Sequence, residues 1–363
     1  MNSDQFYMKL ALMLARKGME GASPNPLVGA VVVKNDKVVG KGCHKRYGEA
    51  HAEVNALNNA GKKAKGATLY LNLEPCCHFG KTPPCTDAVI KAGIKRVVAG
   101  MTDPNPKVSG KGFDALRNAG IEVHTGVLEE ECRKLNEAFT KRMTTGRPFV
   151  ILKTAASLDG KTATKYRESK WITSEASRSH VHKLRKQVDA IMTGIGTVLA
   201  DDPLLTPRIG RVKKLPLRVV VDSLLRVPAS AKVAGVNTLF VTTDNAPAEK
   251  VEFLESQKSQ VEIFKSMNSK VNMTLVMDYL GKKGINSMMV EAGPELSGSL
   301  LREGLVDKVV FFYAPKIIGG AGSPGMVGGG GIEKLSDAIP LRGVKIKKIG
   351  DDIMIEGYVY RNS

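Results

Sequence analysis

The stretch LEPCCHFGKTPPC, at residues 73–85, places three of the chain's five cysteines within ten residues. Its first four residues end ATLYLNLEPC at residues 67–76, which is typical of a strand. It is followed by TDAVIKAG at residues 86–93, which is typical of a helix capped by Thr86. Strands and helices that alternate at this length indicate an α/β layer with a partly parallel sheet. The cysteine loop is therefore expected where a strand of that sheet ends.

Upstream of this stretch, the sequence indicates a hairpin followed by a helix. LVGAVVVKNDKVVGKG at residues 27–42 is typical of two strands joined by a turn at residues 35–36. EAHAEVNALNNAGKKAKG at residues 49–66 predicts a helix that begins near Ala50. Downstream, IKRVVAGMTDPNP at residues 94–106 indicates a further strand.

A domain boundary is expected within MTTGRPFVILKTAAS. Gly146 and Pro148 interrupt a polar helical stretch there, and a new strand begins at Phe149. We therefore expect two domains, residues 1–146 and residues 147–363.

The second half repeats the alternation of strands and helices. Its expected strands are VDAIMTG, LRVVVDS, TLFVTTD, INSMMVEAG and KVVFFYAP. Two of them run into glycine-containing turns at residues 194–196 and 293–298. Such turns bind phosphates and nucleotides, because backbone N–H groups face the anion. No GxGxxG is present, however, and glycines of this kind also serve only turns and caps.

The composition is that of a soluble globular protein, with 42% hydrophobic and 25% charged residues. No run approaches the roughly 18 apolar residues of a membrane span, and the apolar N-terminal stretch lacks the basic residues of a signal peptide. We therefore expect a cytoplasmic protein whose cysteines are reduced and serve metal binding or packing. The net charge of +18 is divided between both domains (+8 and +10), so it fits anionic small molecules at least as well as RNA.

His51, Cys76 and Cys85 are candidate metal ligands. One imidazole and two thiolates suit tetrahedral zinc, and three protein ligands leave the fourth position open for water, as at catalytic sites. Glu53 would point into the same cavity from the first turn of a helix, where a carboxylate can pass a proton to a leaving amine. The pattern H-x-E followed by P-C is the zinc deaminase signature.

A structural zinc site is the alternative to a catalytic one. It needs a fourth ligand, for which Cys43, Cys77 and His78 are the candidates. Neighbouring Cys76 and Cys77 would have difficulty aiming both sulfurs at one metal, and a structural site leaves Glu53 unexplained.

The eight residues between Cys76 and Cys85 exceed the C-x-x-C spacing of nucleoside and tRNA deaminases. They bring in His78 and Lys81, which can supply charge for a substrate phosphate. This favours a small phosphorylated pyrimidine over RNA. A nucleic-acid base deaminase with an RNA-binding second half, and a non-catalytic zinc-stabilised binding protein, remain as alternatives.

Several long motifs resemble one family over nearly the whole chain. SPNPLVGAVVV, GKGCHKRYGEAHAEVNAL, LEPCCHFGKTPPCTDA and DPNPKVSGKG resemble the deaminase half of the bifunctional riboflavin-biosynthesis deaminase–reductase family. LKTAASLDGKTAT, SKWITS, GIGTVLADDPLLTPR and VEAGPELSGSLL resemble its reductase half, in the same order. The resemblance implies an α/β protein with an N-terminal cytidine-deaminase-like three-layer domain and a C-terminal dihydrofolate-reductase-like domain.

The resemblance implies that the first domain hydrolytically deaminates 2,5-diamino-6-ribosylamino-4(3H)-pyrimidinone 5′-phosphate. Zinc would be held by His51, Cys76 and Cys85, and Glu53 would be the proton shuttle. The positions that match the family's substrate pocket are Asn25, His44, His78, Lys81, Asp103 and Asn105. Both asparagines lie in PNP turns, where asparagine also simply supports the backbone.

The resemblance implies that the second domain uses NADPH to reduce the ribosyl group at C1′, giving 5-amino-6-ribitylaminouracil 5′-phosphate. The positions that match its substrate site are Lys153, Ser169, Arg185, Leu205, Arg208 and Glu291. The positions that match its NADPH site are Ala155, Trp171, Thr197, Asp201, Ser223, Gly293, Pro294, Glu295, Leu296, Ser297, Gly298 and Ser299.

Elementary chemistry supports several of these roles. Arg185 and Arg208 are suitable bidentate clamps for a phosphate, and Lys153 and Glu291 are candidates to support proton movement. Trp171, the only tryptophan, can pack on a flat ring, although core packing is the interpretation that the residue type favours by itself.

The remaining cysteines and the partners complete the expectations. Cys43, Cys77 and Cys132 are interpreted as small buried side chains without thiol chemistry. We expect a phosphorylated small-molecule substrate, no nucleic-acid or membrane partner, and a homo-oligomer associated through the second domain.

Overall fold

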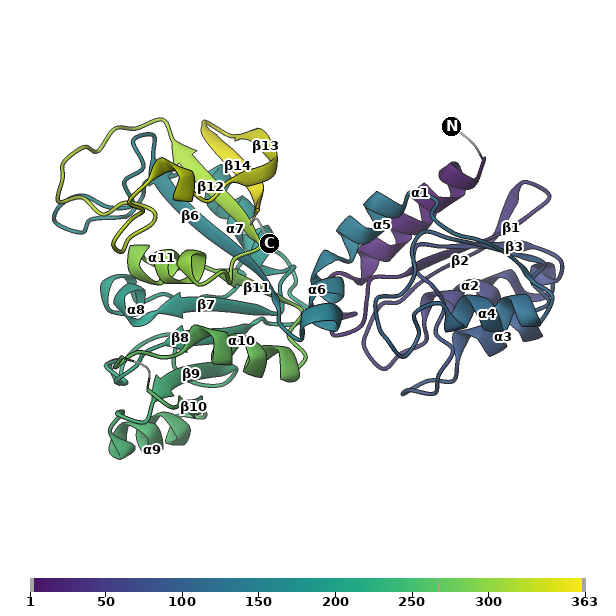
Figure 1. Cartoon of the computed structure of the whole chain (residues 1–363), viewed down its shortest axis with the longest axis horizontal. Coiled ribbons are helices and arrows are strands. Elements are labelled where there is room, and N and C mark those ends of the chain that lie inside the picture. The colour runs from purple at the N-terminus through teal and green to yellow at the C-terminus, as the bar shows by residue number, and fades with distance from the viewer. Residues whose placement is uncertain (1–2, 267, 361–363) are drawn as a thin grey trace. The chain divides into compact units, whose positions relative to one another are not determined.

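Figure 1 shows the computed structural model, which describes residues 3–266 and 268–360. The chain divides into two units, Met1–Gly146 and Arg147–Ser363. Each unit is built on one β-sheet and has its own buried apolar core. No helix in the described part of the chain is both long and apolar enough to cross a membrane.

The sheet of the first unit has five strands in the order β2-β1-β3-β4-β5. They are β1 (Gly29–Lys34), β2 (Lys37–Cys43), β3 (Thr68–Leu71), β4 (Arg96–Ala99) and β5 (Glu122–His124). β1 pairs antiparallel with β2 and β3, whereas β3, β4 and β5 run parallel. The expected hairpin is confirmed, since Asn35 and Asp36 form its turn with φ angles of 49° and 57°.

Helices cover both faces of this sheet and make three layers (Figure 1). They are α1 (Ser3–Ala15), α2 (Ala52–Ala60), α3 (Cys85–Lys91), α4 (Lys111–Asn118), α5 (Glu129–Leu135) and α6 (Glu137–Thr145). Short 3-10 turns follow α1 and α2 at Arg16–Gly18 and Gly61–Ala64. The α1 helix packs on β1 and β3, and α2 packs on β1 and β2.

A glycine in β2 lets α2 approach the sheet closely. A Cβ atom at Gly42 would lie 2.2 Å from the carbonyl oxygen of Ala52, the first residue of α2. Only glycine fits so close an approach of two backbones. The contact sets the position of the N-terminus of α2, where His51 and Glu53 lie.

The structure corrects two expectations around the cysteine stretch. The α3 helix begins at Cys85, directly after Pro84, so Thr86 lies inside the helix and is not its cap. The strand β3 ends at Leu71, and the side chain of Asn72 bonds instead to backbone groups of the segment that leads into β1. The cysteine loop is therefore longer than the sequence predicts.

The sheet of the second unit has nine strands in the order β10-β9-β8-β7-β11-β6-β12-β14-β13. They are β6 (Phe149–Ser157), β7 (Ala190–Gly194), β8 (Leu217–Val221), β9 (Thr238–Thr243), β10 (Gln260–Phe264), β11 (Ser287–Val290), β12 (Lys308–Ala314), β13 (Leu341–Ile349) and β14 (Asp352–Val359). The strands from β10 to β12 in this order run parallel, whereas β14 and β13 add an antiparallel hairpin at one edge.

The helices of the second unit are α7 (Glu175–Arg185), α8 (Ile195–Asp201), α9 (Ala248–Ser256), α10 (Met273–Lys282) and α11 (Pro294–Arg302), with a 3-10 turn at Leu335–Asp337. The strand that begins at Phe149 and the five other expected strands are confirmed. The helices after the two glycine turns are also confirmed, as α8 and α11.

In the second unit the strands β10, β13 and β14 were not expected from the sequence, and in the first unit β5 was not. Most side chains of β13 are exposed on both faces of the hairpin. Without one buried face, a strand lacks the alternation of apolar and polar residues by which it is recognised.

The inner parallel strands β7 and β8 are buried on both faces. Neighbouring residues Ile191 and Met192 of β7 belong to different core clusters, as do Val219 and Val220 of β8. Burial of both faces explains the continuous apolar runs of these strands. Residues that follow β7, β8 and β11, among them Thr197, Ser223 and Glu291, line the large pocket of this unit.

Candidate active sites

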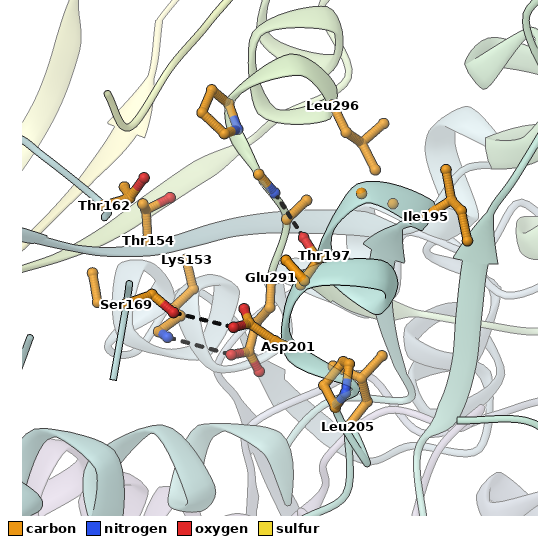
Figure 2. A pocket seen from close by; sticks show the side chains of 18 of the residues that line it. Lys153, Thr154, Thr162, Ser169, Ile195, Thr197, Asp201, Leu205, Glu291 and Leu296 are labelled. Carbon is orange, nitrogen blue, oxygen red and sulfur yellow. Dashed lines mark hydrogen bonds and ion pairs between the residues drawn. The ribbon is translucent and has the colours of Figure 1, made fainter. Parts of the chain in front are cut away.

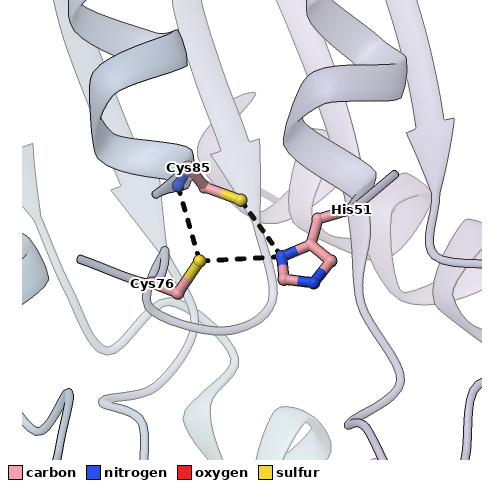
Figure 3. Close-up of side chains that lie close together, drawn as sticks. All are labelled: His51, Cys76 and Cys85. Atoms are coloured by element: carbon pink, nitrogen blue, oxygen red, sulfur yellow. Dashed lines mark hydrogen bonds between the residues drawn. The ribbon is translucent and has the colours of Figure 1, made fainter. Parts of the chain in front are cut away.

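Three side chains from separate elements meet in the first unit (Figure 3). His51 directly precedes α2, Cys76 lies in the loop after β3, and Cys85 is the first residue of α3. Nδ1 of His51 lies 3.2 Å from Sγ of Cys85 and 3.6 Å from Sγ of Cys76. The three ligand atoms all lie within 4.8 Å of one another.

These distances fit a tetrahedral zinc ion. Zn–S bonds of about 2.3 Å and Zn–N bonds of about 2.0 Å separate neighbouring ligand atoms by roughly 3.5 Å. Within the described residues the group has three members, and Cys43, Cys77 and His78 are not among them. This supports a site with an open fourth position over the four-ligand structural alternative.

Hydrogen bonds prepare the loop cysteine for metal binding. Cys85 and His51 both hydrogen-bond to the sulfur of Cys76 and lower its pKa, whereas the same contact with Cys76 raises the pKa of the Cys85 thiol. The backbone N–H of Cys85 also donates to this sulfur at 3.4 Å. Cys76 is therefore held as the thiolate, the form that binds metals.

Glu53 lies in the first turn of α2 and is only 4% exposed. Burial raises the pKa of Glu53 to about 7, and the negative charge of Cys76 adds to the shift. A carboxyl group with this pKa can both take up and release a proton near neutral pH. Glu53 is not one of the three candidate ligands, but its carboxyl group hydrogen-bonds to the thiol of Cys85, so it lies directly beside them.

His44 and Asn25 lie next to this centre. The ring centres of His44 and His51 are 5.1 Å apart, edge to face. Nδ1 of His44 donates to the carbonyl oxygen of Ala50 at 3.2 Å, so Nε2 accepts from Nδ2 of Asn25 at 3.1 Å. Burial lowers the pKa of His44, which favours this neutral form. Asn25 thus contacts a second predicted site residue and does more than support its turn.

Asp103 and Asn105 share one turn of the chain. Oδ1 of Asp103 accepts from the backbone N–H of Asn105 at 2.8 Å, and Oδ1 of Asn105 accepts from the backbone N–H of Lys107 at 3.1 Å. Burial raises the pKa of Asp103 to about 6, and the charge of Cys76 contributes. The Asn105 side chain therefore does support its turn, as the alternative interpretation of the PNP motif has it.

The loop between the two cysteine ligands is partly exposed. Nδ1 of His78 is buried without a hydrogen-bond partner in the described part of the chain. Lys81 is exposed, and its Nζ lies 4.2 Å from the centre of a tyrosine ring. Cys77 is half-buried, so the expectation of a buried side chain is wrong for Cys77, whereas it is confirmed for Cys43 and Cys132.

The second unit contains a pocket of about 1010 Å³ (Figure 2). This volume reaches the upper end for small-molecule sites, which suits a cofactor and a substrate together. Most of the predicted residues line it, namely Lys153, Ala155, Ser169, Trp171, Arg185, Thr197, Asp201, Leu205, Arg208, Ser223, Glu291, Gly293, Pro294, Glu295, Leu296 and Ser299.

Two predicted cofactor residues do not line the pocket. Ser297 is fully buried. Gly298 packs against a loop, since a Cβ atom there would lie 2.0 Å from the carbonyl oxygen of Gly328. Leu296 and Ser299 face the pocket from the same helix. With 3.6 residues per turn, a contiguous helical motif cannot direct all its side chains to one side.

Lys153, Arg185 and Glu291 form an ion cluster on the pocket wall. Arg185 bonds Glu291 with both ends of its guanidinium, from Nε to Oε1 at 2.6 Å and from Nη2 to Oε2 at 3.0 Å. Nζ of Lys153 lies 3.3 Å from Oε2 of Glu291. Burial raises the pKa of Glu291, but the charges of Arg185 and Lys153 outweigh it and lower the pKa to about 2.

The two arginines proposed as phosphate clamps therefore differ. Arg185 already donates two hydrogen bonds from its guanidinium to the carboxylate of Glu291. The side chain of Arg208 lines the pocket and forms no ion pair within the described residues. In the part of the chain that the structure describes, the only hydrogen bond of Arg208 runs from its backbone N–H to Nδ1 of His182, at 3.2 Å. Arg208 is thus the arginine available to an anion.

Hydrogen bonds also hold the cofactor side of the pocket together (Figure 2). The hydroxyl of Ser169 donates to Asp201 at the end of α8, at 3.1 Å. The backbone N–H of Gly293, which caps α11, donates to Oγ1 of Thr197 at 3.1 Å. The loop before α7 and the helices α8 and α11 are thereby joined around one cavity, whose polar wall fits a nucleotide cofactor.

Trp171 is 63% exposed at this pocket, so the core-packing interpretation is wrong for it. The guanidinium of Arg178 lies 4.5 Å from its ring. Arg178 and His182 both line the pocket from α7 and were not predicted from the sequence. Helical spacing from Arg185 was a signal that could have found them, because residues three or four apart share a helix face.

Two family models match the chain in the same order as these sites. The cytidine and deoxycytidylate deaminase zinc-binding region matches residues 1–101. The RibD C-terminal domain matches residues 148–355. The metal centre falls within the first match and the pocket within the second.

Similar proteins match over nearly the whole chain. The riboflavin biosynthesis protein RibD of Aquifex aeolicus is 49% identical, over 97% of this chain and 97% of its own. That of Escherichia coli is 44% identical, over 97% and 98%. The structure of Acinetobacter baumannii RibD superposes with a TM-score of 0.90 at 37% identity, covering 99% of both chains. A diaminohydroxyphosphoribosylaminopyrimidine deaminase/5-amino-6-(5-phosphoribosylamino)uracil reductase from Thermotoga maritima gives 0.86 at 37% identity, also over 99% of both.

Proposed function

The chain belongs to the RibD family of bifunctional riboflavin biosynthesis enzymes, and we propose how its two units divide the two reactions. Residues 1–146 carry the zinc-dependent hydrolytic deamination of 2,5-diamino-6-ribosylamino-4(3H)-pyrimidinone 5′-phosphate. Residues 147–363 carry the NADPH-dependent reduction of the ribosyl group to ribityl. The observation that carries this proposal is the convergence of one imidazole and two cysteine sulfurs beside a buried carboxyl group.

In the deaminase step, His51, Cys76 and Cys85 hold the metal. Bound zinc supplies the positive charge that activates water for attack on the amino-bearing carbon. Glu53 takes up a proton at its carboxylate and delivers it to the leaving nitrogen. Its pKa of about 7 supports this role, since the group must exist in both forms at neutral pH.

We assign substrate contacts in the first unit to the predicted residues around this centre. Asn25 and His44 bind the pyrimidine edge, a role supported by their direct contact beside His51. Asp103 contacts the same pyrimidine ring from its own turn, at residues 103–107. The Asn105 side chain stabilises that turn. His78 and Lys81 in the cysteine loop are assigned to bind the substrate phosphate.

In the reductase step, the pocket residues of the second unit orient cofactor and substrate. NADPH supplies the hydride that reaches C1′ of the ribosyl group. Arg208, without a carboxylate partner in the described residues, binds the substrate phosphate. Lys153 keeps a proton at Nζ next to Glu291 and can hand it to the substrate as the hydride arrives.

We also propose that the chain works in the cytoplasm as a homo-oligomer and binds no nucleic acid. Its positive charge is not gathered in one tail, so it suits phosphorylated small molecules at two sites.

The proposal is tested by supplying the diamino-pyrimidinone phosphate to the full chain with and without NADPH. Ammonia should appear in both reactions, and NADPH oxidation should follow only where the deaminated product has formed. Ammonia release without any later NADPH oxidation would contradict the proposed reductase activity of the second unit. NADPH oxidation without ammonia release would remove the deaminase assignment.

A further inference from the structure

Glu74 is a buried carboxylate that the proposed mechanism does not use. It lies two residues before Cys76 and is 3% exposed. Its Oε2 accepts from the backbone N–H groups of Asp103 at 3.0 Å and Gly110 at 2.9 Å. Its Oε1 accepts from the backbone N–H of Gly112 at 2.9 Å. Both oxygens are therefore engaged with one distant segment of the chain.

Backbone groups hold this charge without help from a cation. Among the described residues, no lysine, arginine or histidine forms an ion pair with Glu74. A further N–H, from Phe113, lies 3.4 Å from Oε1. Gly112 and Phe113 belong to the first turn of the eight-residue helix α4, whose N–H groups have no partner inside the helix. Hydrogen bonds from several N–H groups offset the desolvation cost of a buried carboxylate.

The two segments joined by Glu74 also meet through their backbones. The N–H of Glu74 donates to the carbonyl oxygen of Met101 at 3.0 Å. A Cβ atom at Gly112 would lie 2.2 Å from the carbonyl oxygen of Pro75. The start of α4 is thus packed directly on the residues that lead to Cys76. The loop from residue 101 to residue 112 cannot shift without disturbing these contacts.

This loop carries Asp103 and Asn105. The N–H of Asp103 is itself bonded to Glu74, and the carboxylate of Asp103 then fixes Asn105. A chain of hydrogen bonds therefore runs from the loop that holds a metal ligand to the loop assigned to the substrate. Glu74 is the member of this chain that belongs to the cysteine loop.

We propose that Glu74 is a positioning residue of the deaminase site, which sets the distance between the metal centre and the substrate loop that carries Asp103 and Asn105. Glu74 is not itself a catalytic residue, because it is buried and its oxygens are occupied by the protein. The inference rests on the proposed deaminase function and adds a residue outside the predicted substrate pocket.

Glu74→Gln tests this inference in the full chain. Glutamine has the same shape, but its NH2 group would face N–H donors and leave them without an acceptor. Because small displacements of binding groups are costly, we expect KM for the pyrimidine phosphate to rise roughly 10- to 100-fold while kcat falls much less. Zinc content per chain should stay that of the wild type. Reduction of the deaminated substrate by the second unit should be unchanged.

The matched control is Asp114→Asn, which removes an exposed carboxylate from the same first turn of α4. It should leave KM and kcat unchanged. A double-mutant cycle with Asn105→Ala then asks whether Glu74 acts through the loop. If it does, the double variant should have a KM no higher than the worse single variant, whereas independent effects would multiply.

Three results would overturn the inference: an unchanged KM in Glu74→Gln, loss of zinc from that variant, or multiplying effects in the cycle. Loss of zinc would place the action of Glu74 on the metal ligands instead of the substrate loop. Failure of the proposed function is a separate result, because the wild-type chain would then release no ammonia.

Discussion

Glu53 combines a position beside the candidate metal ligands with a carboxyl group whose pKa is raised by burial to about 7. Glutamine keeps its shape but cannot carry a proton. We therefore expect Glu53→Gln to lower kcat for ammonia release by about 10²- to 10⁴-fold. Zinc content and NADPH-dependent reduction of the deaminated substrate should not change. Ammonia assays and metal analysis on the purified chain measure these quantities.

A suitable control for that variant is Glu49→Gln. Glu49 lies just upstream, pairs with Arg46 at 3.6 Å and has a side chain that is 50% exposed. This substitution should leave ammonia release at the wild-type rate. If Glu53→Gln behaves in the same way, Glu53 is not the proton carrier.

At the same scale, Glu291 makes stability depend on pH. Its pKa is lowered from 4.5 to about 2, because the charges of Arg185 and Lys153 outweigh the effect of burial. The ion cluster therefore stabilises the second unit above about pH 4.5, and this contribution is lost as the pH falls toward 2. We expect Glu291→Gln to lower the free energy of unfolding by about 3–5 kcal/mol at pH 7, since two cations remain without their partner.

Denaturant unfolding of wild type and variant at pH 7 and pH 3 measures this effect. The difference between them should be smaller at pH 3. Glu252→Gln, which changes an exposed carboxylate of α9, is the control and should show little difference at either pH. A difference for Glu291→Gln that stays constant with pH contradicts the role given to the ion cluster.

At the scale of the element, the close packing of α2 on β2 positions the candidate active site of the first unit. In Gly42→Ala the new methyl group would lie 2.2 Å from the carbonyl oxygen of Ala52, so α2 must move away from the sheet. Overpacking of this kind costs about 1–3 kcal/mol. We expect weaker zinc binding and slower ammonia release, because His51 and Glu53 move with the helix.

Metal titration and thermal unfolding measure the effect of Gly42→Ala. The comparison is Gly330→Ala in the second unit, where an added Cβ atom would meet nothing within 4 Å. That variant should bind zinc as the wild type does. Wild-type zinc affinity in Gly42→Ala would show that the close approach of α2 is not needed.

Elements also show where sequence reasoning reaches its limit. The glycine turn before α11 was predicted, but the motif alone could not tell that Ser297 and Gly298 face away from the pocket. The strand β13 escaped prediction because its side chains are mostly exposed. Both failures concern the surroundings of an element, which local pattern does not describe.

At the scale of the whole molecule, the two candidate sites lie in different units of one chain. The described metal ligands belong to the first unit and the large pocket to the second. We expect a chelator that removes zinc to abolish ammonia release and to leave the reduction of deaminated substrate by NADPH unchanged. Added zinc should restore ammonia release. Loss of both activities on chelation would contradict this division of labour.

The sequence by itself determined the three candidate metal ligands, the α/β class of both units and the family. His51, Cys76 and Cys85 could be chosen because few residue types bind zinc, and the hydrophobic pattern of β6, β7 and β11 is local. Long motifs added the pocket residues of the second unit, of which most do line the cavity.

Only the tertiary structure decided which side chains are already engaged. It pairs Arg185 with Glu291 and leaves Trp171 exposed. It also joins Glu74 by a hydrogen bond to the backbone of Asp103, which is distant in the sequence. Pairing and burial depend on groups that are distant in sequence and adjacent in space. No local pattern encodes them, because each is settled by the packing of the whole unit.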